Sequence, residues 1–537
     1  MISTMSKPNI ILILADDMGF SDLGVTGSEI QTPNLNSMAR QGILLTSMYN
    51  CARCCPTRAS LLTGLYPHKA GIGHMTPDLG LEAYQGYLKS NVLTIGEILK
   101  MADYRTLMSG KWHVGGNYIA REVDNWTPGD STHPTPRQRG FDKFFGIVDG
   151  SANHFSPHFL MEDDKKIEIG SEDFYFTDAI TDKAIQMIEC GDKEQPFFLY
   201  LGHTAPHWPL QAPEESIAKY EGAYLKGWDY IRAARHEEMQ SQGILRHNWD
   251  LSPRDKSAPA WTEIKNADWE AMRMAVYAAQ VDRMDRSIGK LIQSLKKRKN
   301  FDNTLIFFLS DNGGCAEFLA EDGFLQRFPK ETADGRKVTL GNIIGKRPGD
   351  AQTFMSYDLP WSNVSNAPFR LHKHWVHEGG ISTPLIVHWP EKIKRACVSH
   401  EPAHVVDILP TIMEVAGASY PKEFKEQRTT RLDGESMVPM LEGKKWSREQ
   451  PIYWEHEGNS AVRMNNMKLV RLHGRPWELY DMDNDRTELR NLAGKNVALE
   501  TSLKREYLAW EETCGVEDWS KIEQRFLKAF RLKTLHG

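Results

Sequence analysis

The stretch Asn9-Ile10-Ile11-Leu12-Ile13-Leu14-Ala15-Asp16-Asp17 decides the fold class. Its continuous apolar run is typical of a strand buried on both faces of a parallel sheet, and it ends abruptly in two carboxylates. Four other apolar runs have the same character, and helical patterns lie between them. Strands are expected at 105–108, 197–201, 305–309 and 385–389, and helices at 32–42, 94–102, 177–190, 268–299 and 407–416. This alternation predicts an α/β fold with a large doubly wound mixed sheet flanked by helices.

The chain changes character after about residue 440. Short strand-like segments joined by polar turns occupy 452–455, 460–464, 467–472 and 478–480, and a helical pattern begins near residue 495. We therefore expect a large α/β domain over 1–440. A smaller α+β subdomain is expected over 441–537, with a short antiparallel sheet and a terminal helix.

The composition is that of a globular protein, and its charge balance does not indicate a strongly charged binding partner. Of the 537 residues, 40% are hydrophobic, and 65 basic against 71 acidic side chains give a net charge of −6. This balance offers no general attraction for nucleic acid, so any positive charge that binds an anion must be local. The seven cysteines are an odd number and thinly spread, so they do not predict a disulfide framework.

The N-terminal region carries no predicted membrane span or targeting segment. Its longest apolar run, Ile10–Ala15, is too short to cross a bilayer, and no signal-peptide cleavage pattern accompanies it. We therefore expect a cytoplasmic location for the sequence as given, and a periplasmic or secreted one if a signal peptide has been removed. The sequence leaves the oligomeric state open.

The sharpest chemical motif is Cys54-Cys55-Pro56-Thr57-Arg58-Ala59-Ser60-Leu61-Leu62-Thr63-Gly64. It matches the pattern C-x-P-x-R followed by L-T-G. From here the chain resembles the type I sulfatases of the alkaline-phosphatase superfamily, especially the longer bacterial arylsulfatases, and the resemblance runs from residue 7 to about residue 495. It implies an alkaline-phosphatase-like fold and a maturation enzyme that converts Cys54 to Cα-formylglycine. Two other interpretations are a zinc half-site made by Cys51 and Cys54 and an inert buried thiol, but no second C-x-x-C or H-x-H pair accompanies the first.

A hydrated formylglycine can do what a thiol cannot. In the mechanism that the resemblance implies, one hydroxyl of the hydrate attacks the sulfate ester and forms a covalent sulfo-enzyme intermediate. Deprotonation of the second hydroxyl then expels sulfate, whereas a thiolate would leave a dead-end adduct. Arg58 is permanently charged and lies four residues after Cys54, so it is suited to hold an oxygen of the hydrate.

Carboxylates at the ends of two expected strands predict a metal site. Asp16 and Asp17 follow the first strand, and Asp311-Asn312 follows the strand at 305–309. Ligands of such sheets bind at the carboxyl ends of the strands, so these side chains are expected to converge. An all-oxygen set suits Ca²⁺ better than zinc. The resemblance implies that Asp16, Asp17, Asp311 and Asn312 bind Ca²⁺ together with the oxygen of residue 54.

Two further elements are similar to the sulfate-binding elements of the family. In Gly110-Lys111-Trp112-His113, the resemblance implies that Lys111 binds sulfate and that His113 pairs with residue 54. The two side chains are two residues apart, so they share one side of an extended segment. Lys373 lies five residues before Glu378-Gly379-Gly380, the spacing of the family's second sulfate-binding lysine.

A general acid is expected in Ala205-Pro206-His207-Trp208-Pro209. By resemblance, His207 contacts the substrate and donates a proton to the leaving oxygen. His203, four residues earlier, is the alternative donor.

Other positions are candidates for substrate contact alone. These are Asn153, His154 and His74. The segment 315–371 looks like the insertion of the longer bacterial arylsulfatase-like members, and we expect it to wall the pocket. Its tryptophan-rich end, which includes Trp361, would either stack on a sugar or aryl ring or pack in the core.

The sequence thus predicts an arylsulfatase-like sulfuric ester hydrolase that acts on a sulfated small molecule or saccharide. One alternative is a phosphodiester or phosphonate monoester hydrolase of the same superfamily. A second is a non-catalytic protein that binds sulfated glycans, if Cys54 stays a thiol. The sequence does not predict which sugar is bound or which of its positions carries the sulfate.

Overall fold

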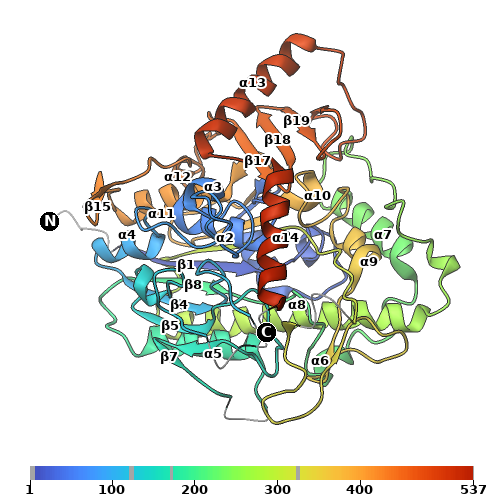
Figure 1. The fold of residues 1–537 in the computed structure, drawn as a ribbon, viewed down its shortest axis with the longest axis horizontal. Helices are drawn as coiled ribbons and strands as arrows, with labels where there is room; N and C mark the ends of the chain where they lie inside the picture. The colour runs from blue at the N-terminus through green and yellow to red at the C-terminus, as the bar shows by residue number, and fades with distance from the viewer. Residues whose placement is uncertain (1–6, 120–121, 123–125, 170–172, 322–326, 536–537) are drawn as a thin grey trace.

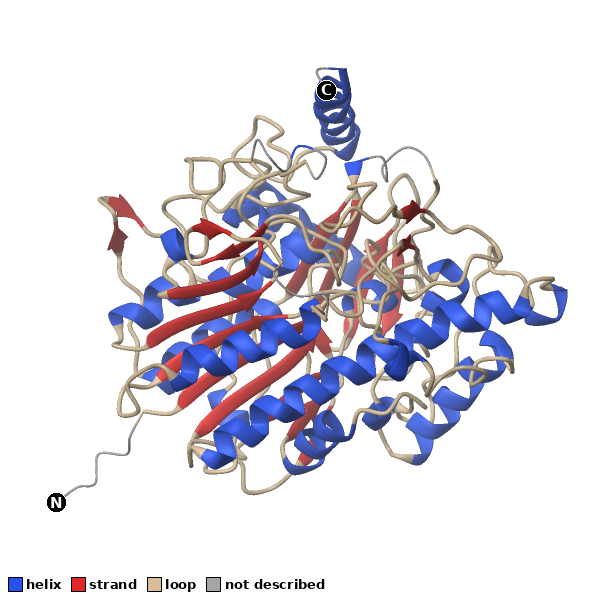
Figure 2. Cartoon of the chain, turned by 90° about the horizontal axis from the view of Figure 1, so that it is seen from below, coloured by secondary structure: helices blue, strands red, loops and turns tan. Residues whose placement is uncertain are grey.

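A ten-stranded mixed sheet forms the centre of the molecule (Figures 1 and 2). The computed structural model describes residues 7–119, 122, 126–169, 173–321 and 327–535, with side chains up to residue 529. From edge to edge the strands are β13 (Cys397–Ser399), β2 (Ile43–Leu45), β12 (Leu385–His388), β9 (Thr304–Ser310), β1 (Asn9–Ala15), β8 (Phe197–Gly202), β4 (Arg105–Gly110), β5 (Lys143–Ile147), β6 (Leu160–Glu162) and β7 (Lys165–Lys166).

The middle of the sheet is parallel, as the apolar runs predicted. β9, β1, β8, β4 and β5 run in one direction. β12 was expected to be parallel and is not, because it pairs antiparallel with both β2 and β9. An apolar run carries no information on strand direction, and the sequence therefore could not show this reversal.

Helices cover both faces of the sheet, which confirms the doubly wound α/β class. α1, α5 and α8 pack on one face, and α2, α4 and α11 pack together on the other. Side chains alternate along β1, so Ile10 and Leu12 join the core under α2 and α4, whereas Ile11 and Ile13 join the core under α1 and α5. The helices of this part are α1 (Pro33–Gln41), α2 (Cys54–Thr63), α3 (Pro67–Ala70), α4 (Ile95–Met101), α5 (Phe176–Glu189), α6 (Glu214–Ile217), α7 (Gly227–Ser241), α8 (Ala267–Lys297), α9 (Asp358–Ser365), α10 (Glu378–Ile381), α11 (Ile408–Ala416) and α12 (Val438–Leu441).

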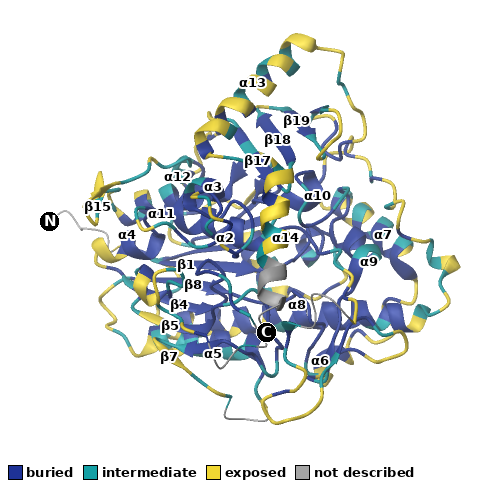
Figure 3. Ribbon diagram, in the orientation of Figure 1, coloured by how far each residue is buried: buried dark blue, intermediate teal, exposed yellow. Residues whose placement is uncertain are grey.

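A four-stranded antiparallel sheet follows, as expected for the C-terminal region. α13 packs on it and keeps an exposed outer face (Figure 3). The sequence predicted one terminal helix, but the chain forms two, because Gly515 ends α13 with a φ of 70°. The elements are β17 (Ile452–His456), β18 (Asn459–Met464), β19 (Met467–Arg471), β20 (Glu478–Asp481), α13 (Val497–Cys514) and α14 (Trp519–Leu535).

Three small strand pairs complete the described structure. They are β3 (Met48–Tyr49) with β14 (Ala403–His404), β10 (Thr339–Leu340) with β11 (Thr353–Phe354), and β15 (Glu423–Phe424) with β16 (Gln427–Arg428). None of the helices in the described residues has both the length and the apolar surface to cross a membrane.

A buried group of charges, here called the seam cluster, joins the C-terminal sheet to the large one. Lys468 Nζ, on β19, lies 2.9 Å from Glu378 Oε1 and 2.8 Å from Glu488 Oε1. Arg486 Nε lies 3.2 Å from Glu378 Oε2. The cluster is Glu378, Glu488, Lys468 and Arg486, all 0–1% exposed.

Candidate active site

Four central strands end together and bring distant polar residues to one edge of the sheet. Ala15 lies opposite Ser310, and Gly202 lies opposite both Leu14 and Gly110. The residues that follow these strand ends are therefore neighbours in space, as the sequence predicted. They include Asp16, Asp17, Lys111, His203, Asp311 and Asn312.

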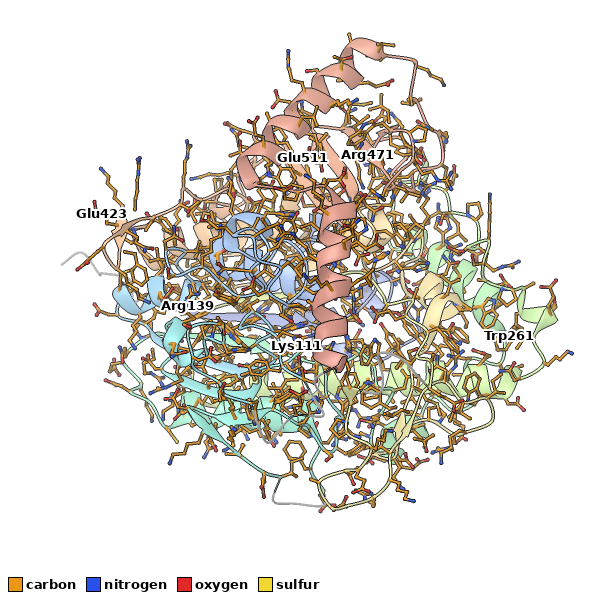
Figure 4. The ribbon with its side chains drawn as sticks, viewed as in Figure 1. Lys111, Arg139, Trp261, Glu423, Arg471 and Glu511 are labelled. Atoms are coloured by element: carbon orange, nitrogen blue, oxygen red, sulfur yellow. The ribbon has the colours of Figure 1, made fainter. Side chains whose placement is uncertain are left out.

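Lys111 depends on a glycine for its position. Gly110 has a φ of 115°, and a Cβ atom there would lie 1.9 Å from the carbonyl oxygen of Gly202. Only glycine allows β4 to lie this close to β8 at its end. The Lys111 side chain, labelled in Figure 4, is buried, and its Nζ lies 2.6 Å from Asp16 Oδ2.

Cys54 is the first residue of α2 and lines a cavity of about 810 Å³. The thiol is 3% exposed, and His113 lies beside it. A helix N-terminus favours negative charge. A hydrogen bond from Cys55 lowers the pKa of the Cys54 thiol well below its usual range, against the effect of burial and with help from Lys111 and His113.

Arg58 directs its donors to protein groups. Its Nε and Nη2 donate to Asp311 Oδ2 at 3.0 and 2.8 Å, and its Nη1 donates to the Lys111 carbonyl at 3.0 Å. Arg58 thus fixes Asp311, and its contact with an oxygen of a modified residue 54 stays a prediction. Both side chains are fully buried.

The buried carboxylates have unequal surroundings. Burial would raise the pKa of Asp17, but Lys373 and His207 outweigh burial, so the net pKa is lowered. Burial and the charge of Asp16 raise the pKa of Asp311 to about 7, although Arg58 acts in the opposite direction. The group around Asp311 is therefore short of positive charge.

The oxygen set fits a hard cation. Asp16 Oδ1 and Asn312 Oδ1 are buried and accept no hydrogen bond within the described residues. Asn312 Nδ2 donates to Asp17 Oδ1 at 2.6 Å, and Asp17 N donates to Asp311 Oδ1 at 3.2 Å. Arg58 Nη2 lies 2.8 Å from Asp311 Oδ2 and 3.6 Å from Asp16 Oδ2, which joins Asp16 to the same group. Buried oxygens without donors are what a Ca²⁺ ion requires.

Lys373 and His207 meet over Asp17. Lys373 Nζ lies 2.8 Å from Asp17 Oδ2, and His207 Nε2 lies 3.4 Å from both groups. His207 Nδ1 lies 2.6 Å from the Trp208 carbonyl, so Nδ1 carries a proton and Nε2 is the position that exchanges one. Burial lowers the pKa of His207 to about 4.

Three of the histidine and asparagine candidates lie away from the cavity lining. His203 is buried, and both of its ring nitrogens lack a hydrogen-bond partner in the described structure. Asn153 Nδ2 donates to the Ala351 carbonyl, and His154 lies behind His207 against the side chain of Gln280. Among the described lining residues, His74 and His207 are present and these three are absent. Asn153 and His154 bond within the protein here, and their contact with a substrate stays a prediction.

The insertion at 315–371 contributes a wall of the cavity. Glu317, Phe318 and Leu319 line it, and Phe328 packs edge-on against Trp208. Residues 322–326 of this segment lie outside the described residues. Trp361 does not reach the cavity, because it is buried against Trp228 and against Trp261, which Figure 4 labels.

Several lining residues were missed from the sequence. Arg53 Nη2 and Glu317 Oε1 form an ion pair at 2.9 Å, and Trp208 Nε1 donates to Glu317 Oε2 at 2.9 Å. Glu457 comes from the turn between β17 and β18, and no sequence motif links it to the site. Asp149 could have been found, because it is the first acidic residue after the buried strand β5.

Comparison with known proteins gives consistent results. The Sulfatase family model matches residues 8–418, and a model described as N-sulphoglucosamine sulphohydrolase, C-terminal, matches residues 369–511. An uncharacterized sulfatase of Schizosaccharomyces pombe is 34% identical, covering 95% of this chain and 94% of its own. An arylsulfatase of Klebsiella aerogenes is 33% identical over 83% of this chain and 94% of its own. The solved structure of Ps i-CgsB in complex with k-i-k-neocarrahexaose is 26% identical, with a TM-score of 0.66 over 96% of this chain and 99% of that one.

Proposed function

Because the chain belongs to the sulfatase family and is a sulfuric ester hydrolase, we propose that it hydrolyses sulfated saccharides at residue 54. The observation that carries this proposal is the convergence of residues from four separate parts of the chain. Cys54, His113, His207 and Lys373 line one cavity, and Lys111 is held beside them by Asp16. Two lysines near a helix N-terminus supply local positive charge for a sulfate group in a chain of net negative charge.

We propose that a maturation enzyme converts Cys54 to Cα-formylglycine. Hydrated, this residue would supply an alcohol nucleophile on sulfur and a second hydroxyl that allows sulfate to depart. His113 lies beside the side chain of residue 54 and is placed to hold or remove the proton of that second hydroxyl. Its Nδ1 has no hydrogen-bond partner among the described residues.

A Ca²⁺ ion is the second proposed cofactor. Asp16, Asp17, Asp311 and Asn312 would hold it, and it would supply a fixed positive charge beside the sulfate group. Arg58 and Lys111 already restrain Asp311 and Asp16, so the oxygen set is held in place by the protein's own ion pairs. Little reorganisation is then needed when the charge of the substrate changes.

His207 is placed to protonate the leaving oxygen. Its Nδ1 is held by the Trp208 carbonyl, so Nε2 faces Lys373 and Asp17. Lys373 is the nearest ammonium group to Nε2 in the described contacts and would both bind sulfate and return the proton to His207. An alcohol oxygen of a sugar needs this proton in order to depart.

The cavity walls support a saccharide substrate. Glu317 and Asp149 offer acceptors for hydroxyl groups, and Trp208 offers an apolar ring face. Ps i-CgsB, which has the same fold over nearly the whole chain, is reported in complex with a neocarrahexaose.

Two experiments test the proposal. Mass spectrometry of the peptide that contains Cys54 should show formylglycine in chain coexpressed with a maturation enzyme, and a thiol alone would leave only glycan binding. Turnover of a panel of sulfated mono- and oligosaccharides should then exceed turnover of the matched aryl phosphonate. Preference for the phosphonate, or no release of sulfate from any saccharide, would contradict the proposed substrate class.

A further inference from the structure

A second group of titratable side chains lies at the cavity wall and takes no part in the steps above. His74 comes from the loop after α3, and His456 and Glu457 come from the end of β17 and its turn. His374 comes from the loop before α10. His74 and Glu457 both line the cavity that contains Cys54.

The ligand atoms of three of these residues have the spacing of a zinc site. His74 Nε2 lies 3.1 Å from Glu457 Oε1, and His456 Nε2 lies 3.6 Å from the same oxygen. The three ligand atoms all lie within 4.8 Å of one another. Tetrahedral zinc with bonds of about 2.0–2.1 Å places its ligand atoms about 3.3 Å apart, and the two measured separations fall on either side of this value.

His456 gives an independent indication of a missing ligand. Its side chain is 0% exposed, and both ring nitrogens lack a hydrogen-bond partner in the described structure. The distance to Glu457 is too long for a hydrogen bond. Buried polar atoms almost always have a hydrogen-bond partner. A buried imidazole without a partner for either nitrogen, next to a carboxylate, therefore indicates an ion between the ring and the carboxylate.

The surroundings are those that support a bound metal. His374 Nδ1 lies 2.6 Å from Glu457 Oε2, which fixes the carboxylate and leaves Oε1 for the ion. Trp519 and Phe526 of α14 pack on the His74 ring with centroids 5.0 and 4.7 Å away, which provides an apolar cover. Figures 1 and 2 show α14 lying across the outside of the loops.

The turn that carries Glu457 is also unusual. Glu457 and Gly458 have φ values of 52° and 75° and form a two-residue turn between the paired residues His456 and Asn459. Asn, Asp or Gly is preferred at the first of these positions, so a glutamate there indicates a requirement for its longer carboxylate.

We propose that His74, His456 and Glu457 bind a Zn²⁺ ion, with His374 holding Glu457 in place. Two imidazoles and one carboxylate are a borderline-soft set that favours zinc, in contrast to the all-oxygen set near Asp16. Three protein ligands leave a fourth position, and because His74 and Glu457 line the cavity, this position faces the space where the substrate lies. The ion would bind an oxygen of the substrate remote from the sulfate group.

The metal content of the whole chain tests this site directly. Calcium-saturated chain is equilibrated with micromolar Zn²⁺, separated from free metal and measured by elemental mass spectrometry. We expect about one zinc per chain. His456→Asn and His74→Asn should lose this zinc, whereas His456→Cys should keep it because a thiolate replaces the imidazole as a ligand. Retention of the full zinc content in His456→Asn overturns the proposal.

Matched controls separate ligation from folding. His68 is a buried histidine paired at 2.9 Å with Glu455, the residue before His456, so His68→Asn disturbs the same region without removing a ligand and should keep the zinc. Zinc loss in His68→Asn equal to that in His456→Asn counts against a specific site. Should the His456 variants fail to fold, Co²⁺ added to the calcium-saturated wild-type chain gives the answer. A strong visible spectrum of tetrahedral cobalt supports the site, and a weak octahedral spectrum or no binding overturns it.

Discussion

Two buried clusters of charged side chains in this protein both combine carboxylates with lysine and arginine. They differ in which of their buried atoms have no partner. The catalytic cluster contains three carboxylates and three cations, and the seam cluster contains two of each. All members are 5% exposed or less. The catalytic cluster is Asp16, Asp17, Asp311, Arg58, Lys111 and Lys373, and the seam cluster is Glu378, Glu488, Lys468 and Arg486.

The electrostatic balance differs although the formal charges cancel in both. Burial acts on Glu378, but Lys468 and Arg486 outweigh it and lower the pKa of that carboxyl. At Asp311, burial and the neighbouring Asp16 prevail and raise the pKa to about 7. Only the catalytic cluster contains a carboxylate oxygen, Asp16 Oδ1, that has neither a hydrogen bond nor an ion pair in the described structure. Among the described residues, the seam cluster leaves a donor, Arg486 Nη1, without a partner, whereas the catalytic cluster leaves an acceptor oxygen that could bind a cation.

The largest expected effect comes from removal of the proposed nucleophile. Cys54→Ala should lower kcat/KM for an aryl sulfate by at least about 10⁴-fold, because no other described group can form the covalent intermediate. The thermal midpoint should change little. Cys51→Ser is the control, since Cys51 Sγ lies 3.3 Å from Ser60 Oγ and takes no part in the site. Normal turnover by Cys54→Ala would remove the basis of the proposed mechanism.

Removal of Ca²⁺ should affect the catalytic cluster and leave the seam cluster unchanged. Chelation with EGTA is expected to lower kcat by about 10³-fold and to lower the thermal midpoint, because the ion stabilises only the folded state. Added Ca²⁺ should restore both, and Asp311→Ala should abolish the calcium dependence. If the activity after EGTA treatment equalled the activity before it, the catalytic cluster would be complete without a metal.

If His207 is the general acid, the effect of replacing it should depend on the leaving group of the substrate. His207→Ala is expected to lower kcat/KM by about 10²–10⁴-fold for sulfated sugars and by no more than about tenfold for nitrophenyl sulfate, whose phenolate departs without a proton. Both series are measured in steady state on one preparation. His203→Ala is the matched control, because His203 is buried and is not among the described residues that line the cavity. Equal losses with both leaving groups would move the assignment away from His207.

Loss of a cation from the seam cluster should lower stability and leave the activity nearly unchanged. Lys468→Met leaves Glu378 and Glu488 without their shared cation and should lower the free energy of unfolding by about 3–5 kcal/mol. The specific activity of the molecules that stay folded should remain within about twofold of wild type. Urea midpoints and active-site titration measure the two quantities. A rate loss without a shift in midpoint would show that the seam takes part in catalysis.

The smallest effect is expected from Glu317, in the wall of the cavity. Glu317→Gln breaks a partly exposed pair with Arg53, and such pairs contribute about 1 kcal/mol or less, so KM for a sulfated saccharide should rise by about fivefold or less. The value of kcat should be unchanged. A large fall in kcat would place Glu317 among the groups that act on the reacting atoms.

Much of the fold and site could be predicted because strand ends and motifs are local. The strand Asn9–Ala15 appears where its apolar run predicted it, and α11 lies within the predicted helix 407–416. The direction of β12 could not be predicted, because pairing depends on a partner far along the chain. Glu457 reaches the cavity only through the packing of the C-terminal sheet, and no spacing rule connects it with His74.

The positions of Asn153 and His154 could not be predicted for a different reason. Both follow β5 in a polar stretch, but the chain leaves the cavity lining after Ser151, and Asn153 and His154 bond to the carbonyls of Ala351 and His207. Sequence position alone does not show where a loop turns.

The burial of Cys54 has a consequence for the biosynthesis of the enzyme. In the folded chain Cys54 is 3% exposed inside a cavity whose walls include Phe526 and Leu527, which come far later in the sequence than Cys54. An active site of another protein cannot enter such a space, so the proposed oxidation must be finished before the fold closes. The residues from Cys54 to Phe526 take on the order of a minute to synthesise, and this interval limits the time available before the cavity can close. The fraction of active enzyme in a cell would then be set by a race between modification and folding, and a chain that folds first would stay inactive however much maturation enzyme is added later.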